Sequence, residues 1–155
     1  MSGSQGGVAA ELPEKAPLVL LIDDLELNII LLEAKLEIQG CATIHAFSGP
    51  SALKLAEEQS PDLIILDVMM PTMDGFEVCR RLKANPRTAA IPVMLLTTVS
   101  GSSARSRGVA AGADDFLTKP VGDTIFFDRM RSLISGARLA EPVDFGPRVR
   151  AGTVG

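Results

Sequence analysis

Three short apolar runs, each followed by a polar residue, limit the folds that this chain can adopt. The runs are LVLLI at 18–22, LIIL at 63–66 and IPVMLL at 91–96. A strand that is apolar along its whole length is typical of a parallel sheet buried on both faces, because a half-solvated strand alternates apolar and polar residues. Stretches with helical patterning separate the runs. The alternation predicts an α/β fold, a doubly wound parallel sheet with helices on both faces.

Length and composition fit one globular domain. The chain has 155 residues, of which 46% are hydrophobic, enough for one domain with a substantial core. We expect a flexible N-terminal arm over 1–16, one domain over 17–137 and a flexible tail over 138–155. Two more strands are expected at 42–46 and 116–118. The expected helices cover 25–39, 51–59, 76–84, 104–111 and 124–135.

Two of these helices carry more apolar residues than one core-facing stripe needs. In helix 25–39, Leu31, Leu32 and Leu36 form the expected core stripe. Three further apolar residues belong either to a partner surface or to a broad packed face, and they are Leu25, Ile29 and Ile30. The last helix has a similar surplus, made up of Phe126, Phe127, Met130, Leu133 and Ile134.

Charge and cysteine content exclude several classes of protein. The net charge is −4 and no run of Lys or Arg is long enough to follow a phosphate backbone, so direct nucleic-acid binding is not expected. Cys41 and Cys79 lack the spacing of a metal or redox motif, which favours two core thiols in a reducing compartment. The sequence shows neither a signal peptide nor an apolar run of about 18 residues. We therefore expect a soluble, cytoplasmic protein with no membrane contact.

Polar side chains follow four of the expected strands at the point where each strand ends. Asp23 and Asp24 follow the first strand and Asp67 follows the third. Thr97 follows the fourth strand and Lys119 follows the last. Ligands of doubly wound sheets bind beyond the carboxyl ends of the strands. These five side chains are therefore the candidate site.

The charges of this set predict a metal ion. Carboxylates in contact repel one another by about 4 kcal/mol per pair at an effective dielectric constant near 20, and Lys119 alone cannot balance three of them. A divalent cation would balance these charges. Hard oxygen ligands favour Mg²⁺, with Mn²⁺ as an alternative. Asp67 is then a carboxylate nucleophile that can attack phosphorus. Thr97 and Lys119 are placed to bind the phosphoryl oxygens.

The same residues resemble the receiver domain of two-component response regulators, which has a flavodoxin-like fold with strand order 2-1-3-4-5. The matching motifs are Asp23-Asp24, LDVMMPTMDGFE around Asp67, PVMLLTT around Thr97, and DDFLTKP with Phe116 and Lys119. The stretches LLEAKL, DVMMPTMDGFEVCRRLK and DFLTKP also look like the receiver that precedes a diguanylate cyclase domain in some bacterial regulators.

The resemblance implies a role for each site residue. Asp67 would accept a phosphoryl group from a phosphohistidine of a histidine kinase or histidine phosphotransfer protein. Asp24, Asp67 and the backbone carbonyl of Met69 would bind Mg²⁺, and Asp23 would act through a bound water. Thr97 and Phe116 would form a switch pair.

The resemblance also implies a signalling role rather than that of an enzyme, since such a domain promotes only its own phosphorylation and dephosphorylation. The peptide bond between Lys119 and Pro120 would be cis. The last strand and the last two helices would form the output surface for an unknown downstream protein. The surplus apolar residues of the last helix would allow a phosphorylation-linked homodimer.

Four positions depart from the usual pattern of that family. Thr98 replaces a small residue and is expected to narrow access to Asp67. Met69 and Val99 are apolar where a side chain often orients the hydrolytic water, so we expect a long-lived phosphoryl group. Thr72 replaces the usual Gly of the turn after Met70.

Other readings remain open from the residues alone. The chain can be a stand-alone receiver, which we favour from the sequence, or a receiver fragment of a longer regulator such as a diguanylate cyclase. A phosphorylation-independent interaction module and a haloacid-dehalogenase-type phosphatase are alternatives of other classes. Asp23 can also serve as a helix cap. The remaining acids are expected to play local roles: Asp74 in a turn with Gly75, Asp114 and Asp115 as solvated acids, and Asp123 as the cap of the last helix.

Overall fold

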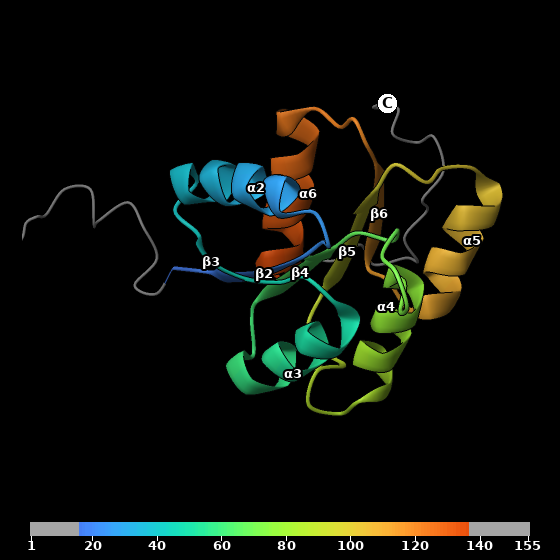
Figure 1. Cartoon of the computed structure of the whole chain (residues 1–155). Coiled ribbons are helices and arrows are strands. Elements are labelled where there is room, and N and C mark those ends of the chain that lie inside the picture. Colours follow the sequence, from blue (N-terminus) through green and yellow to red (C-terminus); the bar gives the residue numbers. More distant parts are fainter. Residues whose placement is uncertain (1–15, 137–155) are drawn as a thin grey trace, which may run out of the picture.

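A computed structural model describes residues 16–136 as a five-stranded parallel sheet with helices on both faces (Figure 1). The strands are β2 Leu18–Ile22, β3 Ala42–Ala46, β4 Leu63–Leu66, β5 Val93–Thr97 and β6 Asp115–Thr118. The helices are α2 Glu26–Ile38, α3 Gly49–Gln59, α4 Gly75–Ala84, α5 Ser102–Ala111 and α6 Asp123–Ile134. The expected arm over 1–16 and tail over 138–155 lie, apart from residue 16, outside the described residues, and the bounds of the domain stay a prediction.

The strand order is β3-β2-β4-β5-β6, which is 2-1-3-4-5 in chain order. Both the doubly wound sheet and the flavodoxin-like order are therefore confirmed. The register pairs Ile22 with Leu66 and Leu66 with Leu95, so β2, β4 and β5 end at the same edge of the sheet. The Asp67 N–H donates to the Ile22 carbonyl at 2.9 Å, which places Asp67 beside Asp23.

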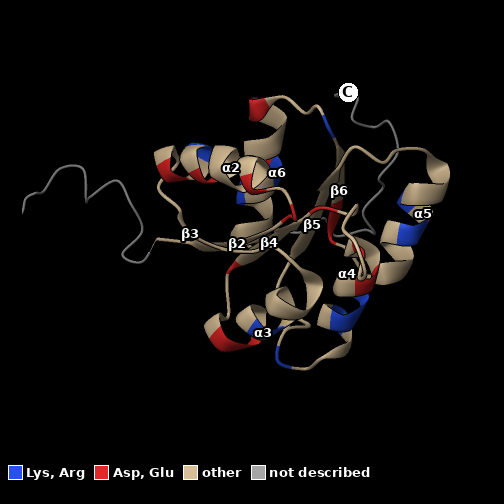
Figure 2. Ribbon diagram, viewed as in Figure 1, with Lys and Arg blue, Asp and Glu red and all other residues tan. Residues whose placement is uncertain are grey.

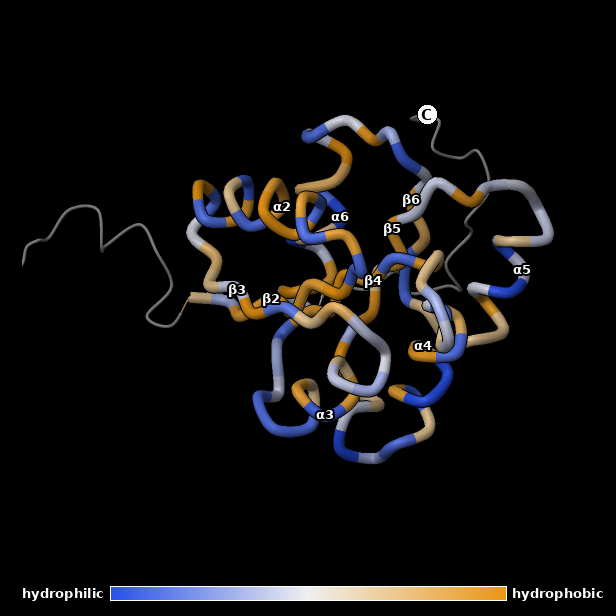
Figure 3. The backbone as a smooth tube through the Cα atoms, in the orientation of Figure 1, coloured by the Kyte–Doolittle hydropathy of each residue, from blue (hydrophilic) through white to orange (hydrophobic). Residues whose placement is uncertain are grey.

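Alternate residues of β2 enter two separate cores. Leu20 and Ile22 pack with the buried residues of α3, α4 and α5. Val19 and Leu21 face the other side and pack with the buried residues of α2 and α6. Figure 3 shows the strands as a hydrophobic layer between the two sets of helices. Burial on both faces explains why β2, β4 and β5 lack an alternating pattern.

Helix α2 turns a different face to the sheet from the one expected. Ile29 and Leu36 are buried, whereas Leu31 is 54% exposed. Residues 29 and 36 are seven apart and share one side of the helix, and residue 31 lies on the opposite side. Leu31 was therefore wrongly assigned to the core stripe. Leu25 and Ile30 are exposed, so α2 has apolar residues on its solvent face as well.

The surplus inferred on the last helix is wrong, because the sheet covers most of it. Four apolar residues of α6 are buried, and Ile125 and Ile134 are partly exposed; the buried ones are Phe126, Phe127, Met130 and Leu133. The predicted cap is also wrong. The residue at the N-cap of α6 is Gly122, and the Asp123 carboxylate instead lies 3.0 Å from the Lys35 ammonium of α2.

Two acids predicted to be solvated are ion-paired within the fold. Asp115 is 4% exposed and accepts a 2.6 Å hydrogen bond from Arg129 of α6. Asp114 accepts 2.8 Å bonds from the Lys83 ammonium and from the Val93 N–H. A charge at this depth needs such partners, and the partners come from distant parts of the sequence.

Cys41 and Cys79 are free and buried, as expected for core thiols. Burial raises the pKa of the Cys79 thiol to about 12, which keeps it protonated and unreactive at neutral pH. Within residues 16–136, no helix is long and apolar enough to cross a membrane.

Candidate functional site

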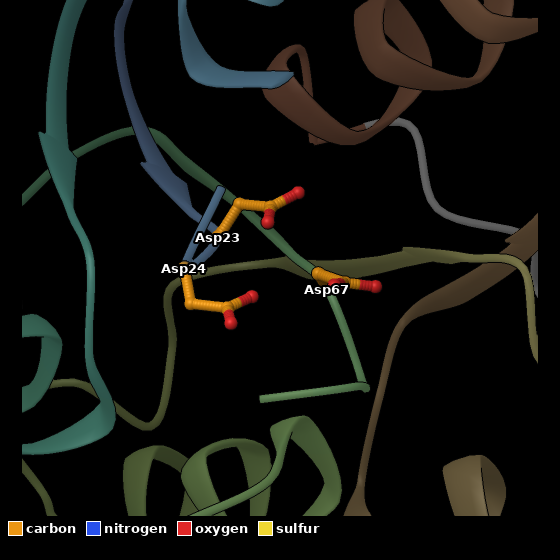
Figure 4. A group of neighbouring side chains, drawn as sticks. All are labelled: Asp23, Asp24 and Asp67. Carbon is orange, nitrogen blue, oxygen red and sulfur yellow. The ribbon is translucent and has the colours of Figure 1, made fainter. Parts of the chain in front are cut away.

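The ends of β2 and β4 bring three carboxylates together at the edge of the sheet. Ligand oxygens of Asp23, Asp24 and Asp67 all lie within 4.8 Å of one another (Figure 4). Figure 2 shows acidic residues gathered where these strands end. Three hard oxygen donors at this spacing suit Mg²⁺, which is bound through one or two carboxylates and keeps several waters. The residues present therefore fit the predicted divalent cation.

Asp23 is the most enclosed of the three acids, with 3% of its surface exposed. Its Oδ1 accepts the Leu25 N–H at 2.9 Å, and its Oδ2 accepts the Asn28 side-chain amide at 3.0 Å. Asp23 thus holds the start of α2, although the residue at the N-cap is Leu25. The sequence-based prediction missed Asn28. Its only signal is its place in the first turn of the helix, five residues after Asp23.

Asp67 is partly exposed, and its electrostatic environment favours the protonated form. Burial is the main cause of its raised pKa, and the Asp23 charge raises the pKa further. The Lys119 charge and hydrogen bonds from the Thr97 hydroxyl and the Met69 backbone oppose this shift. Positive charge beside Asp67 would stabilise its ionised carboxylate. A bound cation or a phosphoryl-binding lysine would supply such a charge.

Strands β5 and β6 deliver the remaining polar groups. Thr97 is fully buried, and its hydroxyl accepts the Val99 N–H at 3.2 Å as well as bonding to Asp67. The Lys119 N–H donates to the Thr97 carbonyl at 2.8 Å, which fixes the end of β6 beside β5. The Lys119 ammonium lies 3.9 Å from Asp23 Oδ2. The peptide bond to Pro120 is cis, as expected.

Phe116 lies on β6 in the core beneath α5 and is 4% exposed. A Cβ atom at Gly108 of α5 would lie 3.0 Å from the Phe116 ring, so the small residue makes room for the aromatic side chain. The structure thus places the Phe116 ring against α5.

Met69 and Thr98 form the rim above Asp67. Met69 is 59% exposed, and the Thr98 hydroxyl lies 3.9 Å from its sulfur atom. In the turn that follows, Thr72 keeps the backbone conformation that suits Gly, although Thr rarely adopts it. Thr72 has a φ of 70°, in the left-handed region that Gly favours. Asp74 caps α4 by accepting the Glu77 N–H at 2.9 Å.

A family model described as the response regulator receiver domain matches residues 19–131. The chain belongs to the response regulator receiver family. The haloacid-dehalogenase alternative is therefore wrong, and a receiver is a signalling domain.

Curated relatives of this receiver include the response regulator PleD of Caulobacter vibrioides, 51% identical over 115 residues. That match covers 74% of this chain and 25% of PleD. The transcriptional regulatory protein AfsQ1 of Streptomyces coelicolor is 43% identical over 118 residues, which cover 76% of this chain and 51% of AfsQ1. The chain thus spans a quarter to about half of these relatives.

Solved receiver structures share the fold. The signal receiver domain of a signal transduction histidine kinase from Syntrophus aciditrophicus has a TM-score of 0.73 and 37% identity. That match covers 84% of this chain and 99% of the solved chain. The receiver domain of the sensor histidine kinase PA1611 from Pseudomonas aeruginosa has a TM-score of 0.72 and 26% identity, covering 78% and 99% of the two chains. That structure has a magnesium ion in its active site cleft.

Proposed function

We propose that this receiver accepts a phosphoryl group on Asp67 from the phosphohistidine of a histidine kinase or histidine phosphotransfer protein. The observation that carries the proposal is the arrangement of Thr97, Lys119 and two further carboxylates around Asp67. A carboxylate so placed can be phosphorylated, because the developing charge on the phosphoryl oxygens meets a hydroxyl and an ammonium group.

The transfer needs no reactant besides the phosphohistidine and Asp67. An Asp67 carboxylate oxygen forms a bond to phosphorus while the phosphorus–nitrogen bond of the donor breaks, and the imidazole nitrogen keeps the electron pair. The product is an acyl phosphate. The Thr97 hydroxyl would donate a hydrogen bond to one phosphoryl oxygen, and the Lys119 ammonium would pair with another. In dephosphorylation, water attacks phosphorus, which restores the Asp67 carboxylate and releases inorganic phosphate.

Asp24, Asp67 and the backbone carbonyl of Met69 would hold Mg²⁺, or Mn²⁺ in its place, with Asp23 acting through a bound water. When bound, the ion neutralises charge on the phosphoryl oxygens and on the carboxylates. The magnesium in the PA1611 receiver supports this assignment. Asp23 already has donors on both oxygens, which is consistent with an indirect role.

Thr97 and Phe116 would link the phosphoryl group to an output surface formed by β6, α5 and α6. Helix α5 is the element best suited to change position. It has no side-chain cap at Gly101, and the residues that it buries are small: Ala104, Gly108 and Ala111. A helix anchored by so little apolar surface is suited to two arrangements of similar energy.

A groove beside the site would receive the phosphodonor. It has a volume of about 460 Å³ and lies between α2 and the residues that follow β5 and β6. Leu31, Thr98 and Lys119 are among its lining residues, so the groove leads from the exposed apolar face of α2 to the site. An apolar groove of this kind suits the amphipathic helices of a histidine-containing bundle. The exposed apolar face of α2 thus fits the partner surface that was one of the two interpretations of its surplus apolar residues.

The matches cover only 25% of PleD and 51% of AfsQ1. The activity of a whole regulator therefore does not follow from the receiver match. We infer that the chain acts as the receiver part of a longer regulator, such as a diguanylate cyclase, or as a receiver that works through protein contacts. The 25% coverage of PleD supports the first arrangement.

Peptide mapping tests the phosphoacceptor. The chain is phosphorylated with acetyl phosphate and Mg²⁺, the acyl phosphate is trapped with borohydride, and the peptides are sequenced by mass spectrometry. We expect the reduced residue at position 67. A modified residue at 23 or 24 would contradict the assignment.

Leu31→Asp tests the groove, with Ile38→Asp as the matched control. Both residues are exposed and apolar on α2, but Leu31 lines the groove and Ile38 does not. We expect Leu31→Asp to slow transfer from a phosphorylated histidine kinase by at least tenfold and to leave transfer from acetyl phosphate unchanged. Equal effects of the two substitutions would show that the donor binds elsewhere.

A further inference from the structure

Asn28 connects α2 to the site through one oxygen atom of Asp23. The Asn28 side-chain amide donates to Asp23 Oδ2 at 3.0 Å. The same oxygen lies 3.9 Å from the Lys119 ammonium. One buried carboxylate oxygen therefore faces two donors, a neutral one in contact and a cationic one just beyond contact.

The two distances describe different interactions with Asp23. An N–H···O hydrogen bond has a length of 2.7–3.2 Å, so Asn28 makes one to Asp23 and Lys119 does not. An ammonium group binds a carboxylate more strongly than an amide does. Lysine also has a flexible four-carbon chain that can close a gap of this size. An Asp23 oxygen without its amide donor would therefore draw Lys119 into contact.

Such a contact would cost the site its free cation. Lys119 is the cation that faces Asp67, and its side chain is 27% exposed. An ammonium group that bonds tightly to Asp23 would have to break that bond before it could meet a phosphoryl oxygen. The neutral amide prevents this because it satisfies Asp23 without adding charge.

We propose that Asn28 is a positioning residue that occupies Asp23 Oδ2 and so keeps the Lys119 ammonium available to the phosphoryl group on Asp67. The proposal rests on the proposed function of Asp67 and adds a residue that acts through Asp23 and Lys119.

A crystal structure of Asn28→Ala tests the positioning directly. We expect the Lys119 ammonium to lie about 3 Å from Asp23 Oδ2 in this variant, the distance of a charge-assisted hydrogen bond. A separation still near 3.9 Å would overturn the proposal. Asn28 is partly exposed in the first turn of α2, and thermal unfolding verifies that the variant is folded.

The kinetic test compares Asn28→Ala in two backgrounds, with acetyl phosphate and Mg²⁺ as the phosphorylating mixture. In the wild-type background we expect phosphorylation to slow roughly tenfold, the effect of one lost hydrogen bond to a charged group. In an Asp23→Asn background there is no carboxylate to draw Lys119 away, so we expect less than about a twofold further effect, within the precision of additivity. Equal slowing in both backgrounds would show that Asn28 only stabilises α2, and would overturn the proposal.

The two tests separate this proposal from the function that it rests on. If wild-type protein takes no phosphoryl group, the proposed function fails and the role of Asn28 in transfer falls with it. If wild-type protein is phosphorylated and Asn28→Ala shows neither the slower rate nor the shorter distance, only the positioning role fails.

Discussion

Gly75 packs against the backbone of Asp67, so that a Cβ atom at position 75 would collide with the Asp67 carbonyl oxygen. The same Cβ atom would lie 2.6 Å from the Cα atom of Val68. The Gly75 N–H also donates to the Val68 carbonyl at 2.8 Å. The first residue of α4 thus fixes the backbone that carries the phosphoacceptor.

Gly75→Ala should therefore destabilise the domain. Crowding backbone atoms that cannot move aside costs about 1–3 kcal/mol, and we expect a loss at the upper end of this range. Gly122→Ala is the matched control, because a Cβ atom there meets no atom within 4 Å of it among the described residues. We expect the control to change the free energy of unfolding by about 1 kcal/mol or less. Urea unfolding measures both variants, and equal losses would contradict the close packing.

Asp67→Asn should stabilise the metal-free domain at neutral pH. Burial raises the pKa of Asp67 in the folded state, so the ionised carboxylate opposes folding. The group's favourable contribution is complete below its unfolded-state pKa of 3.8 and is lost as the pH rises through the higher folded-state pKa. Unfolding in EDTA should show a stability gain for the variant at pH 7 that shrinks as the pH falls toward 4. A gain that grows on acidification would have the wrong sign.

Arg129→Ala should destabilise the domain because it leaves the buried Asp115 carboxylate without its charged partner. Removing one member of a buried pair costs about 3–5 kcal/mol, and the partial exposure of Arg129 argues for roughly 2–3 kcal/mol here. Arg131→Ala on the same helix is the control, since its pair with Asp128 is largely exposed. We expect about 0.5 kcal/mol or less for that change. Thermal unfolding of both variants at pH 7 measures the loss of stability. Equal losses for the two variants would contradict the prediction.

A polar side chain at position 69 should shorten the life of the phosphoryl group. Met69 and Val99 cannot hydrogen-bond a water at the rim, so we expect the wild-type acyl phosphate to last for minutes or longer. Met69→Asn offers an amide to the attacking water and should speed hydrolysis by roughly three- to tenfold, the value of one hydrogen bond. Met73→Leu is the apolar control. Loss of the adduct over time is followed by intact mass, and a wild-type half-life of seconds would contradict the expectation.

Elements set by local pattern were predicted well, and elements set by distant partners were not. Strands at 18–22, 42–46 and 63–66 have the predicted bounds. For 18–22 and 63–66 the reason is that each apolar run ends at an acid. The five polar residues at the strand ends meet as expected, because parallel strands share one carboxyl edge. Asp115 was misassigned because its partner, Arg129, is fourteen residues away on another element.

Helix α2 shows a second limit of sequence-based prediction. Its apolar residues lie on both sides, so the pattern does not say which side meets the sheet, and Leu31 and Ile29 exchanged roles. Asn28 was missed for a related reason. A single amide in a helical turn has no distinctive spacing, and its bond to Asp23 depends on how the strand end and the helix meet.

The most direct test of the account is the intact mass of the chain after incubation with acetyl phosphate and Mg²⁺. Asp67→Asn and a sample with EDTA serve as controls. We predict one phosphoryl adduct on the wild-type chain and none in either control, because the transfer needs the Asp67 carboxylate and the metal that its neighbours would hold. An adduct that survives Asp67→Asn, or a wild-type chain that takes no phosphoryl group, would contradict the central claim.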